Sequence, residues 1–424
     1  MDAGQASRFS LADFFGPETE DPLEPPSDYA EWRNASTWAT GLYERRMLAA
    51  PTPRTEIDAG GSRHSVVNLA SYNYLGLATH PETVAAAKAA LDHYGTGACG
   101  SPVLSGKTDL HGALESALVD FTGREAALLF NSGFGGALGT LQGLLRKGDV
   151  AVIDDKSHMC LIDGTKLAGA QVLPFAHNDP ESLDEALTRT KGKRRLVVVE
   201  GVYSMDGDVA DLPALLEVTE RHGVGVMIDE AHSILAMGKT GGGVTEHFGA
   251  ESRIALKYAT FSKAFASCGS FVAGRSRTLE YLRYYANPYG FSCALPPPVV
   301  ASVLKALEIA RRDDSLRSRL AENATYFRTQ LHALGIDTGT STTHVVPIIL
   351  GPHRELLYML SYAMLARGLF VAPVDYPSVP EDQVRFRASI TAAHTRADLD
   401  EALNIIEGTV VKALRNARQV RAAS

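Results

Sequence analysis

The sequence predicts an α/β fold with two parts: a large domain with a mostly parallel central sheet and a smaller C-terminal α+β domain. Two observations support this prediction. From about residue 66, short apolar runs alternate with helix-like segments, which is typical of buried parallel strands joined by crossover helices. After Pro298 the pattern changes to long amphipathic helices and a few short strands. We therefore expect an N-terminal segment over 1–65, a large domain over 66–298 and a small domain over 299–424.

The apolar runs locate the individual strands of the large domain. We expect strands at 126–130, 150–153, 171–175, 196–200, 224–228, 256–261 and 270–273. Apolar residues at helical spacing predict helices between them, for example at 183–190 and 212–222. In the small domain we expect helices at 299–312, 315–334 and 397–415, and strands at 345–350, 369–372 and 384–389. The glycine-rich stretch 95–100 follows no convincing strand, so we interpret it as a turn rather than a dinucleotide-binding loop.

The N-terminal stretch 11–30 has a different composition. It is acidic and rich in proline, and it carries no basic side chain. Such a segment buries little apolar surface, so we expect roughly the first thirty residues to be mobile or to order only against another surface. The sequence does not indicate a role for it.

Composition excludes several classes of partner. The formal net charge is −8, which argues against nucleic acid or an anionic membrane surface, since both attract basic stripes. The uncharged stretches 126–145 and 284–304 contain polar residues with many glycines or prolines, so we expect no membrane span. The chain opens with no secretory signal pattern, and its four cysteines, Cys99, Cys160, Cys268 and Cys293, are far apart. We therefore expect a cytoplasmic protein without disulfides and without a metal site.

Polar and ionisable residues follow several of the predicted strands, at the edge where open α/β sheets bind ligands. Lys263 is the sharpest of these signals, because it is the only charged residue between Lys257 and Arg275. Apolar surroundings favour the neutral amine, which can attack a carbonyl and form an imine. The alternative is a lysine whose ammonium reaches water from the strand edge.

Asp229 directly follows the predicted strand 224–228, so its carboxylate should emerge at the same sheet edge. An acid paired with an imine-forming lysine is what the ring nitrogen of pyridoxal 5'-phosphate (PLP) needs, because the protonated ring is the electron sink. The alternatives are a metal or ion-pair carboxylate. His158 lies at the same edge, where it either stacks on an aromatic cofactor or is an ordinary core imidazole.

A possible phosphate site follows the strand 126–130. Ser132, Gly133 and Phe134 open a predicted helix, whose unpaired N–H groups can bind phosphate. The hydroxyl groups of Thr260 and Ser262 lie at the neighbouring strand end. The alternative is tight packing between strand and helix, which more commonly explains such a glycine turn.

Seven motifs occur in one order and at one spacing, and together they resemble the α-oxoamine synthase family of fold-type I PLP enzymes over residues 66–414. The motifs are NLASYNYLGL (68–77), FNSGF (130–134), EGVYSMDGD (200–208), DEAH (229–232), TFSK (260–263), FSCALPP (291–297) and RFRASITAAH (385–394). Within the family, the residues SYNY at 71–74 and DEAHSI at 229–234 are most similar to soluble serine palmitoyltransferase. One departure is Cys293, where the family pattern has a hydroxyl group that Ser292 would have to replace.

The resemblance implies roles for individual residues. Lys263 would form the Schiff base with PLP and move the substrate α-proton, with Asp229 on the ring nitrogen and His232 on the phenolic oxygen. His158 would stack on one ring face and Ala231 on the other. The resemblance places the cofactor's phosphate and remaining contacts at Ser132, Gly133, Phe134, Thr260, Ser262 and Ser204, and the substrate at Tyr72 and Arg387.

The resemblance also implies an activity. This is a decarboxylative Claisen-type condensation of an amino acid with an acyl thioester, carried on coenzyme A or a carrier protein, giving an α-amino ketone, CO2 and a free thiol. Serine is the favoured amino acid, with alanine and glycine as alternatives. A PLP aminotransferase or aldolase and a non-catalytic partner subunit are the rival interpretations. Family members imply a homodimer with sites at the subunit interface.

Overall fold

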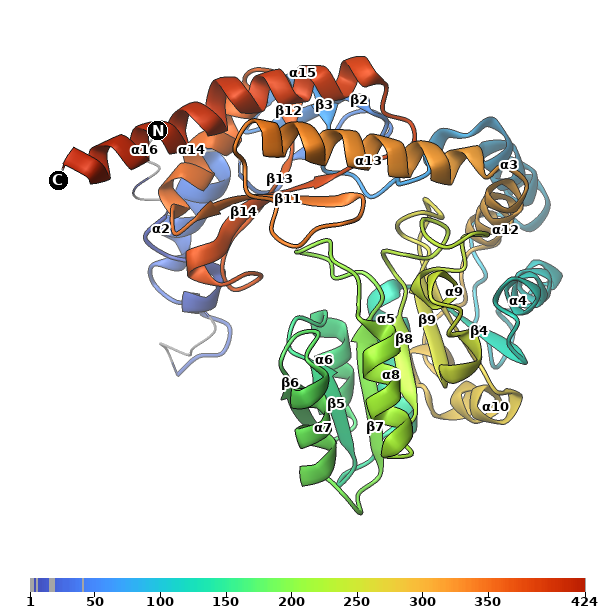
Figure 1. Ribbon diagram of the computed structural model, residues 1–424. Coiled ribbons are helices and arrows are strands. Elements are labelled where there is room, and N and C mark those ends of the chain that lie inside the picture. Colours follow the sequence, from blue (N-terminus) through green and yellow to red (C-terminus); the bar gives the residue numbers. More distant parts are fainter. Residues whose placement is uncertain (1–3, 5–6, 15–19, 40–41, 424) are drawn as a thin grey trace. The chain divides into compact units, whose positions relative to one another are not determined.

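The computed structural model describes residues 4, 7–14, 20–39 and 42–423, and the chain divides into two compact units (Figure 1). Unit 1 comprises Met1–Ser71, Met205–Gly207 and Arg319–Ser424, and unit 2 comprises Tyr72–Ser204 and Asp208–Ser318. The domain boundaries expected after residues 65 and 298 stay a prediction. The units differ from these expected domains mainly in α12, Pro297–Arg312, which packs on α3, Pro81–Tyr94, and α4, Asp109–Thr122, of unit 2.

Unit 2 is built on a seven-stranded sheet of order β4-β10-β9-β8-β7-β5-β6. Its strands are β4 Ala126–Phe130, β5 Val150–Asp154, β6 Gln171–Phe175, β7 Arg195–Glu200, β8 Val226–Asp229, β9 Leu256–Thr260 and β10 Ser270–Gly274. β10 runs antiparallel to both of its neighbours, and β9, β8, β7, β5 and β6 pair in parallel. The expected α/β fold with a mostly parallel sheet is confirmed, and each apolar run corresponds to one strand.

Helices precede, connect and follow these strands. They are α3 Pro81–Tyr94, α4 Asp109–Thr122, α5 Gly133–Leu144, α6 Met159–Leu167, α7 Pro180–Arg189, α8 Leu212–Arg221, α9 Val244–His247, α10 Ser276–Tyr285, α11 Asn287–Gly290 and α12, with short 3-10 turns η3 Leu77–Thr79 and η4 Glu251–Arg253. Two of these helices begin at the edge that carries the polar motifs, because Ser132 caps α5 and His158 caps α6. α5 packs closely on the sheet: a Cβ at Gly136 would lie only 2.0 Å from the Ser270 hydroxyl oxygen.

Unit 1 contains two small sheets. One has the order β1-β2-β3-β12 and the other the order β11-β14-β13. The strands are β1 Arg46–Met47, β2 Arg54–Ala59, β3 Ser62–Asn68, β11 Val345–Gly351, β12 Leu369–Phe370, β13 Ala372–Val374 and β14 Val384–Ser389. The expected single strand at 369–372 is wrong: the chain leaves one sheet at Phe370 and joins the other at Ala372, so one apolar run serves two sheets.

The helices of unit 1 cover these sheets and enclose its core. They are α13 Ser315–Ala333, which belongs to unit 1 from Arg319 on, α14 Arg354–Leu365, α15 Arg396–Ile406 and α16 Lys412–Ala423, with a π-helical turn η6 Glu407–Val411 between the last two and a 3-10 turn η5 Glu381–Gln383 before β14. The expected C-terminal helix at 397–415 is thus longer and carries a π-turn in its middle. Buried side chains such as Phe327, Tyr358 and Phe386 form the core.

Part of the N-terminal segment packs through aromatic rings. η1 Leu11–Phe14, α2 Tyr29–Arg33 and the π-turn η2 Asn34–Ala39 are the described elements of this segment. Trp32 is buried, and its ring lies 5.5 Å from that of Phe14 and 6.0 Å from that of Tyr43. The expectation of a mobile start also covers 1–3, 5–6 and 15–19, which lie outside the described residues. For the whole stretch it stays a prediction.

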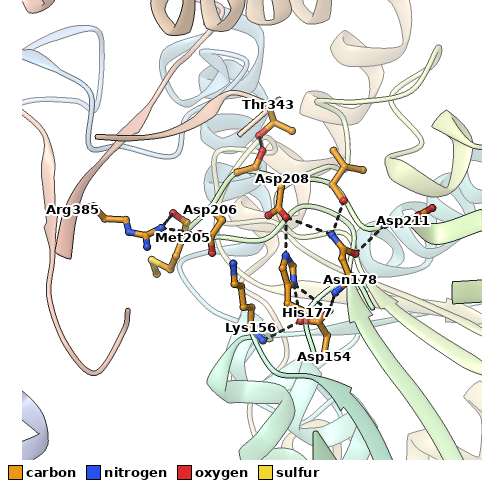
Figure 2. A network of polar contacts seen from close by, with 12 residues as sticks. Asp154, Lys156, His177, Asn178, Met205, Asp206, Asp208, Asp211, Thr343 and Arg385 are labelled. Carbon is orange, nitrogen blue, oxygen red and sulfur yellow. Dashed lines mark hydrogen bonds and ion pairs between the residues drawn. The ribbon is translucent and has the colours of Figure 1, made fainter. Parts of the chain in front are cut away.

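The tripeptide Met205–Gly207 packs with unit 1, although the residues on either side of it belong to unit 2. The buried Arg385 guanidinium on β14 donates to the Met205 carbonyl oxygen (3.1 Å) and to Asp206 Oδ1 (2.9 Å), as Figure 2 shows. Gly207 has a φ of +70°, and a Cβ there would lie 1.9 Å from the Val345 carbonyl oxygen, so only glycine fits. Among all the described residues, no helix is both long and apolar enough to cross a membrane.

Candidate active site

A cavity of about 210 Å³ lies in unit 2, where β7, β8 and β9 end and α5 and α6 begin. Its lining includes most of the residues that the sequence predicted: Gly133, Phe134, His158, Ser204, Asp229, His232, Thr260, Ser262 and Lys263. Ala231, Cys160, Glu200 and Tyr258 complete the lining. The volume is below the range of about 300–1,000 Å³ that is typical of drug-sized ligands, so it suits one small molecule.

Asp229 and Lys263 supply the opposite charges of this cavity. Asp229 is the last residue of β8, and its Oδ1 accepts the Ala231 N–H at 2.8 Å. Burial raises the pKa of Asp229 to about 6, while the nearby positive charge of Lys263 acts against that rise. Lys263 follows β9 by three residues and is half-buried. A buried carboxylate in this place needs a cationic partner, and a protonated ring nitrogen supplies one.

Glu200 is a second buried carboxyl group in the cavity, and the sequence prediction did not count it among the site residues. It ends β7, and its Oε1 accepts the backbone N–H of His158 at 2.5 Å. Burial and the neighbouring charge of Asp229 raise the pKa of Glu200 to about 8. Its position at the end of a predicted strand was the only sequence signal for a place in the site. That signal does not assign a role, because the role of an acid at a strand end depends on its neighbours in the folded chain.

His158 is held through its first turn of helix. The His158 Nδ1 accepts the Cys160 N–H at 3.2 Å, and the Cys160 Sγ lies 2.9 Å from the same nitrogen. A neutral ring that accepts at Nδ1 carries its proton on Nε2. Burial raises the pKa of the Cys160 thiol, so that thiol is protonated and unreactive near neutral pH. His158 is therefore oriented by its own helix, and its neutral ring is a donor at Nε2.

His232 is oriented by a tyrosine. The fully buried Tyr74 lies with its Oη 2.7 Å from His232 Nδ1, and their ring centroids are 6.1 Å apart. Tyr72 is 37% exposed, and its ring centroid lies 6.3 Å from that of His232. Tyr74 was not among the predicted site residues, although it lies in the SYNY motif, because no local pattern shows which tyrosine turns inward.

The start of α5 forms the cradle that was expected for a phosphate. The Ser132 Oγ accepts the Gly135 N–H at 3.0 Å, which caps the helix, and Ser132 itself does not line the cavity. A Cβ at Gly133 would lie 2.8 Å from Thr260 Oγ1, so the backbone approaches β9 closely here. The Thr260 and Ser262 hydroxyl oxygens are 2.7 Å apart. Free N–H groups at the helix start and the Ser262 hydroxyl group form a donor set that fits a phosphate, while the Thr260 hydroxyl group here donates to the Gly269 carbonyl oxygen at 3.0 Å.

Two further predicted residues lie outside this lining. Arg387 is a buried residue of β14 in unit 1, where its Nη1 lies 3.7 Å from Met205 Sδ. Ser292, which would replace the hydroxyl group missing at Cys293, accepts a hydrogen bond from the Asn131 amide. The same amide donates to the Cys293 carbonyl oxygen at 3.0 Å, so Asn131 fixes the 292–293 backbone beside the start of α5.

An acidic group beside the cavity involves a third histidine. Asp154, Asp155 and His177 each offer one atom within 4.8 Å of the others. Both ring nitrogens of His177 are hydrogen-bonded to carboxylates, one on Asp154 and one on Asp208. A histidine bonded in this way is protonated, so the group is an ion-pair cluster.

The donor set of the cavity fits PLP. A buried carboxylate, a half-buried lysine, a helix start with two hydroxyl groups and an imidazole line one small space. Each of these groups matches one part of the cofactor: its ring nitrogen, aldehyde, phosphate and ring face. Of the two readings of Lys263, the one in which the amine faces a binding site agrees with its place in the cavity lining.

Known proteins match most of the chain. The model of the aminotransferase class I and II family matches residues 64–406. The chain is 38% identical to the 8-amino-7-oxononanoate synthase of Thermoanaerobacter pseudethanolicus, over 87% of this chain and 93% of that protein. It is 39% identical to the 8-amino-7-oxononanoate synthase of Symbiobacterium thermophilum, over 86% of this chain and 92% of that one.

Solved structures give the same result for the fold. The serine palmitoyltransferase of Sphingomonas wittichii has a TM-score of 0.85 at 32% identity, covering 90% of this chain and 96% of that one. A PLP-bound serine palmitoyltransferase variant from S. paucimobilis has a TM-score of 0.85 at 33% identity, with the same coverage. Fold, site and relatives agree, and the chain belongs to the aminotransferase class I and II family and, within it, to the α-oxoamine synthases, which are fold-type I, PLP-dependent acyltransferases.

Proposed function

We propose that this enzyme catalyses the decarboxylative, Claisen-type condensation of a small α-amino acid with an acyl thioester. The products are an α-amino ketone, CO2 and a free thiol. Serine is the first candidate for the amino acid, and alanine and glycine are the alternatives. The observation that carries the proposal is the meeting of Lys263, Asp229 and His232 in one cavity of unit 2.

The proposed division of labour follows from the contacts of each side chain. PLP, when bound, supplies an electron sink for the negative charge that develops at the substrate Cα. Lys263 tethers the cofactor and afterwards moves the proton at that carbon, because it is the amine of the cavity lining. Asp229 keeps the ring nitrogen protonated, for which a buried carboxylate at a strand end is suited.

The two cavity histidines act as hydrogen-bond donors in this proposal. With its Nδ1 bonded to Tyr74, His232 presents Nε2 to the phenolic oxygen of the cofactor. His158 stacks on the ring opposite Ala231 and uses Nε2 to polarise the thioester carbonyl. Ser204 lines the site beside them.

The remaining contacts complete the proposed site. Gly133 and Phe134 offer N–H groups to the phosphate, which also receives the Thr260 and Ser262 hydroxyl groups, while Ser132 holds the helix start. Tyr72 and Arg387 are proposed to bind the amino acid, Arg387 through its carboxylate, which a guanidinium group binds in bidentate fashion.

The names of the relatives support the reaction class and leave the amino acid open. An 8-amino-7-oxo compound carries its amine next to a ketone, which is the product skeleton of this condensation. The name serine palmitoyltransferase specifies serine and a fatty acyl group. We further propose a cytoplasmic homodimer with its sites at the subunit interface, which uses an acyl group on coenzyme A or on a carrier protein.

A spectroscopic and product assay tests the proposal. We expect the purified protein with PLP to absorb visible light, and serine, alanine or glycine to change that spectrum at characteristic concentrations. Addition of an acyl-CoA should then release CO2 and free thiol in equal amounts. Formation of a keto acid without CO2 or thiol would instead identify an aminotransferase, and a colourless protein would contradict the proposal.

A further inference from the structure

His177 lies outside the cavity lining and bridges two carboxylates (Figure 2). It follows β6, and its Nδ1 lies 2.9 Å from Asp154 Oδ1, while its Nε2 lies 2.7 Å from Asp208 Oδ2. Asp154 is completely buried and Asp208 nearly so. Because both nitrogens donate to acids, the ring is held as an imidazolium between two negative charges.

Each of these aspartates shapes a different loop of the cavity. Asp154 ends β5 and accepts the Lys156 N–H at 3.0 Å through its carboxylate and the Ser157 N–H at 3.0 Å through its carbonyl. This turn leads directly into His158, which lines the cavity. The turn over residues 154–158 therefore fixes the position of the His158 backbone, from which the imidazole side chain extends.

Asp208 closes the second loop. Its carbonyl oxygen accepts the Tyr203 N–H at 3.1 Å, so that Ser204 lies within a turn that Asp208 fastens. Ser204 lines the cavity, and Glu200 begins the same loop. Asn178, next to His177, also bonds to both loops. Its N–H donates to Asp154 Oδ2 (3.0 Å), and its side-chain amide donates to the Val209 carbonyl oxygen (3.1 Å).

The two loops are thus joined both at the cavity and outside it. On the cavity side, Glu200 accepts the His158 N–H; outside the cavity, His177 joins Asp154 to Asp208. Burial alone would lower the pKa of His177, but the hydrogen bonds and charges of Asp154 and Asp208 raise it to about 9. The other polar groups around this link are Asp155, Lys156 and the ring of Tyr203, whose centroid is 4.4 Å from that of His177.

We propose that His177 is a positioning residue that fixes the spacing between the His158 loop and the Ser204 loop, and so orients both side chains toward bound PLP. The inference rests on the proposed function. It assigns His177 no contact with cofactor or substrate. Loss of this link lets the two loops shift by a fraction of an ångström, which alters how the cofactor ring is held more than whether the protein folds.

The test compares two histidine–aspartate pairs. His177→Asn removes the bridge, and His222→Asn is the matched control, because the His222 Nε2 bonds Asp184 (2.9 Å) at the surface between α7 and α8. We expect His177→Asn to weaken PLP binding at least tenfold and to reduce the induced circular dichroism of bound PLP. In the same variant kcat should fall by about 10²-fold with a smaller change in KM. The control should keep the wild-type values.

Three outcomes decide the matter. Equal cofactor binding, dichroism and kcat in the two variants would overturn the proposal. If His177→Asn does not fold, Asp208→Asn replaces it and should show the same cofactor changes; failure of both variants to fold would assign the bridge to general stability and also overturn the proposal. Wild-type protein that takes up no PLP would refute the proposed function itself, which separates that failure from this one.

Discussion

The two ends of β9 each carry a buried or half-buried lysine, and the chain uses them differently. Lys257, near the start of the strand, is 1% exposed and donates from Nζ to the Gly242 carbonyl oxygen at 2.7 Å. Lys263, beyond the end of the strand, is half-buried and lines the cavity. The more deeply buried amine is thus bonded to backbone as part of the fold, while the less buried one faces the space that fits PLP.

The same contrast holds for two adjacent acids at the end of β8. Asp229 lines the cavity, whereas the Glu230 carboxylate accepts the N–H groups of Val244 and Thr245, both at 2.9 Å. Neighbouring residues of a strand point to opposite faces, so one faces the cavity and the other caps α9. Burial alone therefore does not identify the functional residue of either pair. The functional residue is the one whose side chain lines the cavity.

The two lysines give the largest expected difference. Lys263→Ala should abolish the visible absorbance of lysine-tethered PLP and lower kcat by at least about 10³-fold, since the amine serves both as tether and as proton carrier. Lys257→Met should keep the absorbance and lower the thermal midpoint, because it removes the bond to Gly242 and a positive charge near Glu230, neither of which lines the cavity. Both properties are read from one absorbance spectrum and one melting curve. A normal PLP spectrum in Lys263→Ala would break the comparison.

The two acids give the next largest difference. Asp229→Asn removes a charge-assisted hydrogen bond of about 1.5–3 kcal/mol to the ring nitrogen, so kcat/KM should fall by roughly 10- to 100-fold. Glu230→Gln should cost stability, through its bonds to the α9 backbone, and leave kcat/KM within about threefold. Steady-state kinetics and thermal melts separate the two effects. Equal losses of kcat/KM in both variants would contradict the assignment.

Glu200, the second buried acid of the cavity, should make the stability of the protein depend on pH. The folded protein raises the pKa of this group from 4.5 to about 8, so folded protein binds the proton more tightly than unfolded chain does. The resulting stability is complete below about pH 4.5 and is lost as the pH rises through 8. In the absence of PLP, Glu200→Gln should therefore flatten the fall of the thermal midpoint between about pH 4.5 and 8. An unchanged pH profile would show that Glu200 ionises normally.

The smallest expected effect concerns Tyr74. Tyr74→Phe removes the partner of His232 Nδ1 but keeps the ring in its buried place. Loss of one such bond costs about 1 kcal/mol, so we expect a fall in kcat of roughly fivefold. Tyr358→Phe is the control, because it removes another buried tyrosine hydroxyl, bonded to Asp375 in unit 1 at 3.2 Å, and should leave kcat unchanged. An equal effect of both substitutions on kcat would argue that Tyr74 does not orient His232.

Much of the fold follows from the pattern of the sequence, because a buried parallel strand needs an uninterrupted apolar run. The bounds of β4, β6 and β14 agree with the expected ones. The sheet of β2 and β3 was not expected. β2 buries only Thr55 and Ile57 among polar residues, and β3 buries only its last three residues, so neither strand contains a long apolar run. The break at Val371 between β12 and β13 has no local marker either.

The candidate site was predictable where a polar residue follows an apolar run. Asp229, Thr260 and Lys263 were found in this way. Tyr258 lies inside a strand, and its Oη donates to the Gly133 carbonyl oxygen at 2.5 Å, a pairing across 125 residues that no local pattern indicates. His177 does follow a strand, but its function depends on two aspartates that only the folded chain brings together.

The assignment of Met205–Gly207 to unit 1 has a practical consequence for dissecting this enzyme. Any fragment that spans 72–318 carries this tripeptide away, and the remaining part then keeps Arg385 without the Asp206 carboxylate. A buried guanidinium left without its anion is costly, so the fragment built from the chain's two ends should be insoluble when expressed alone. Truncation experiments would then report on that orphaned cation instead of on the autonomy of either half.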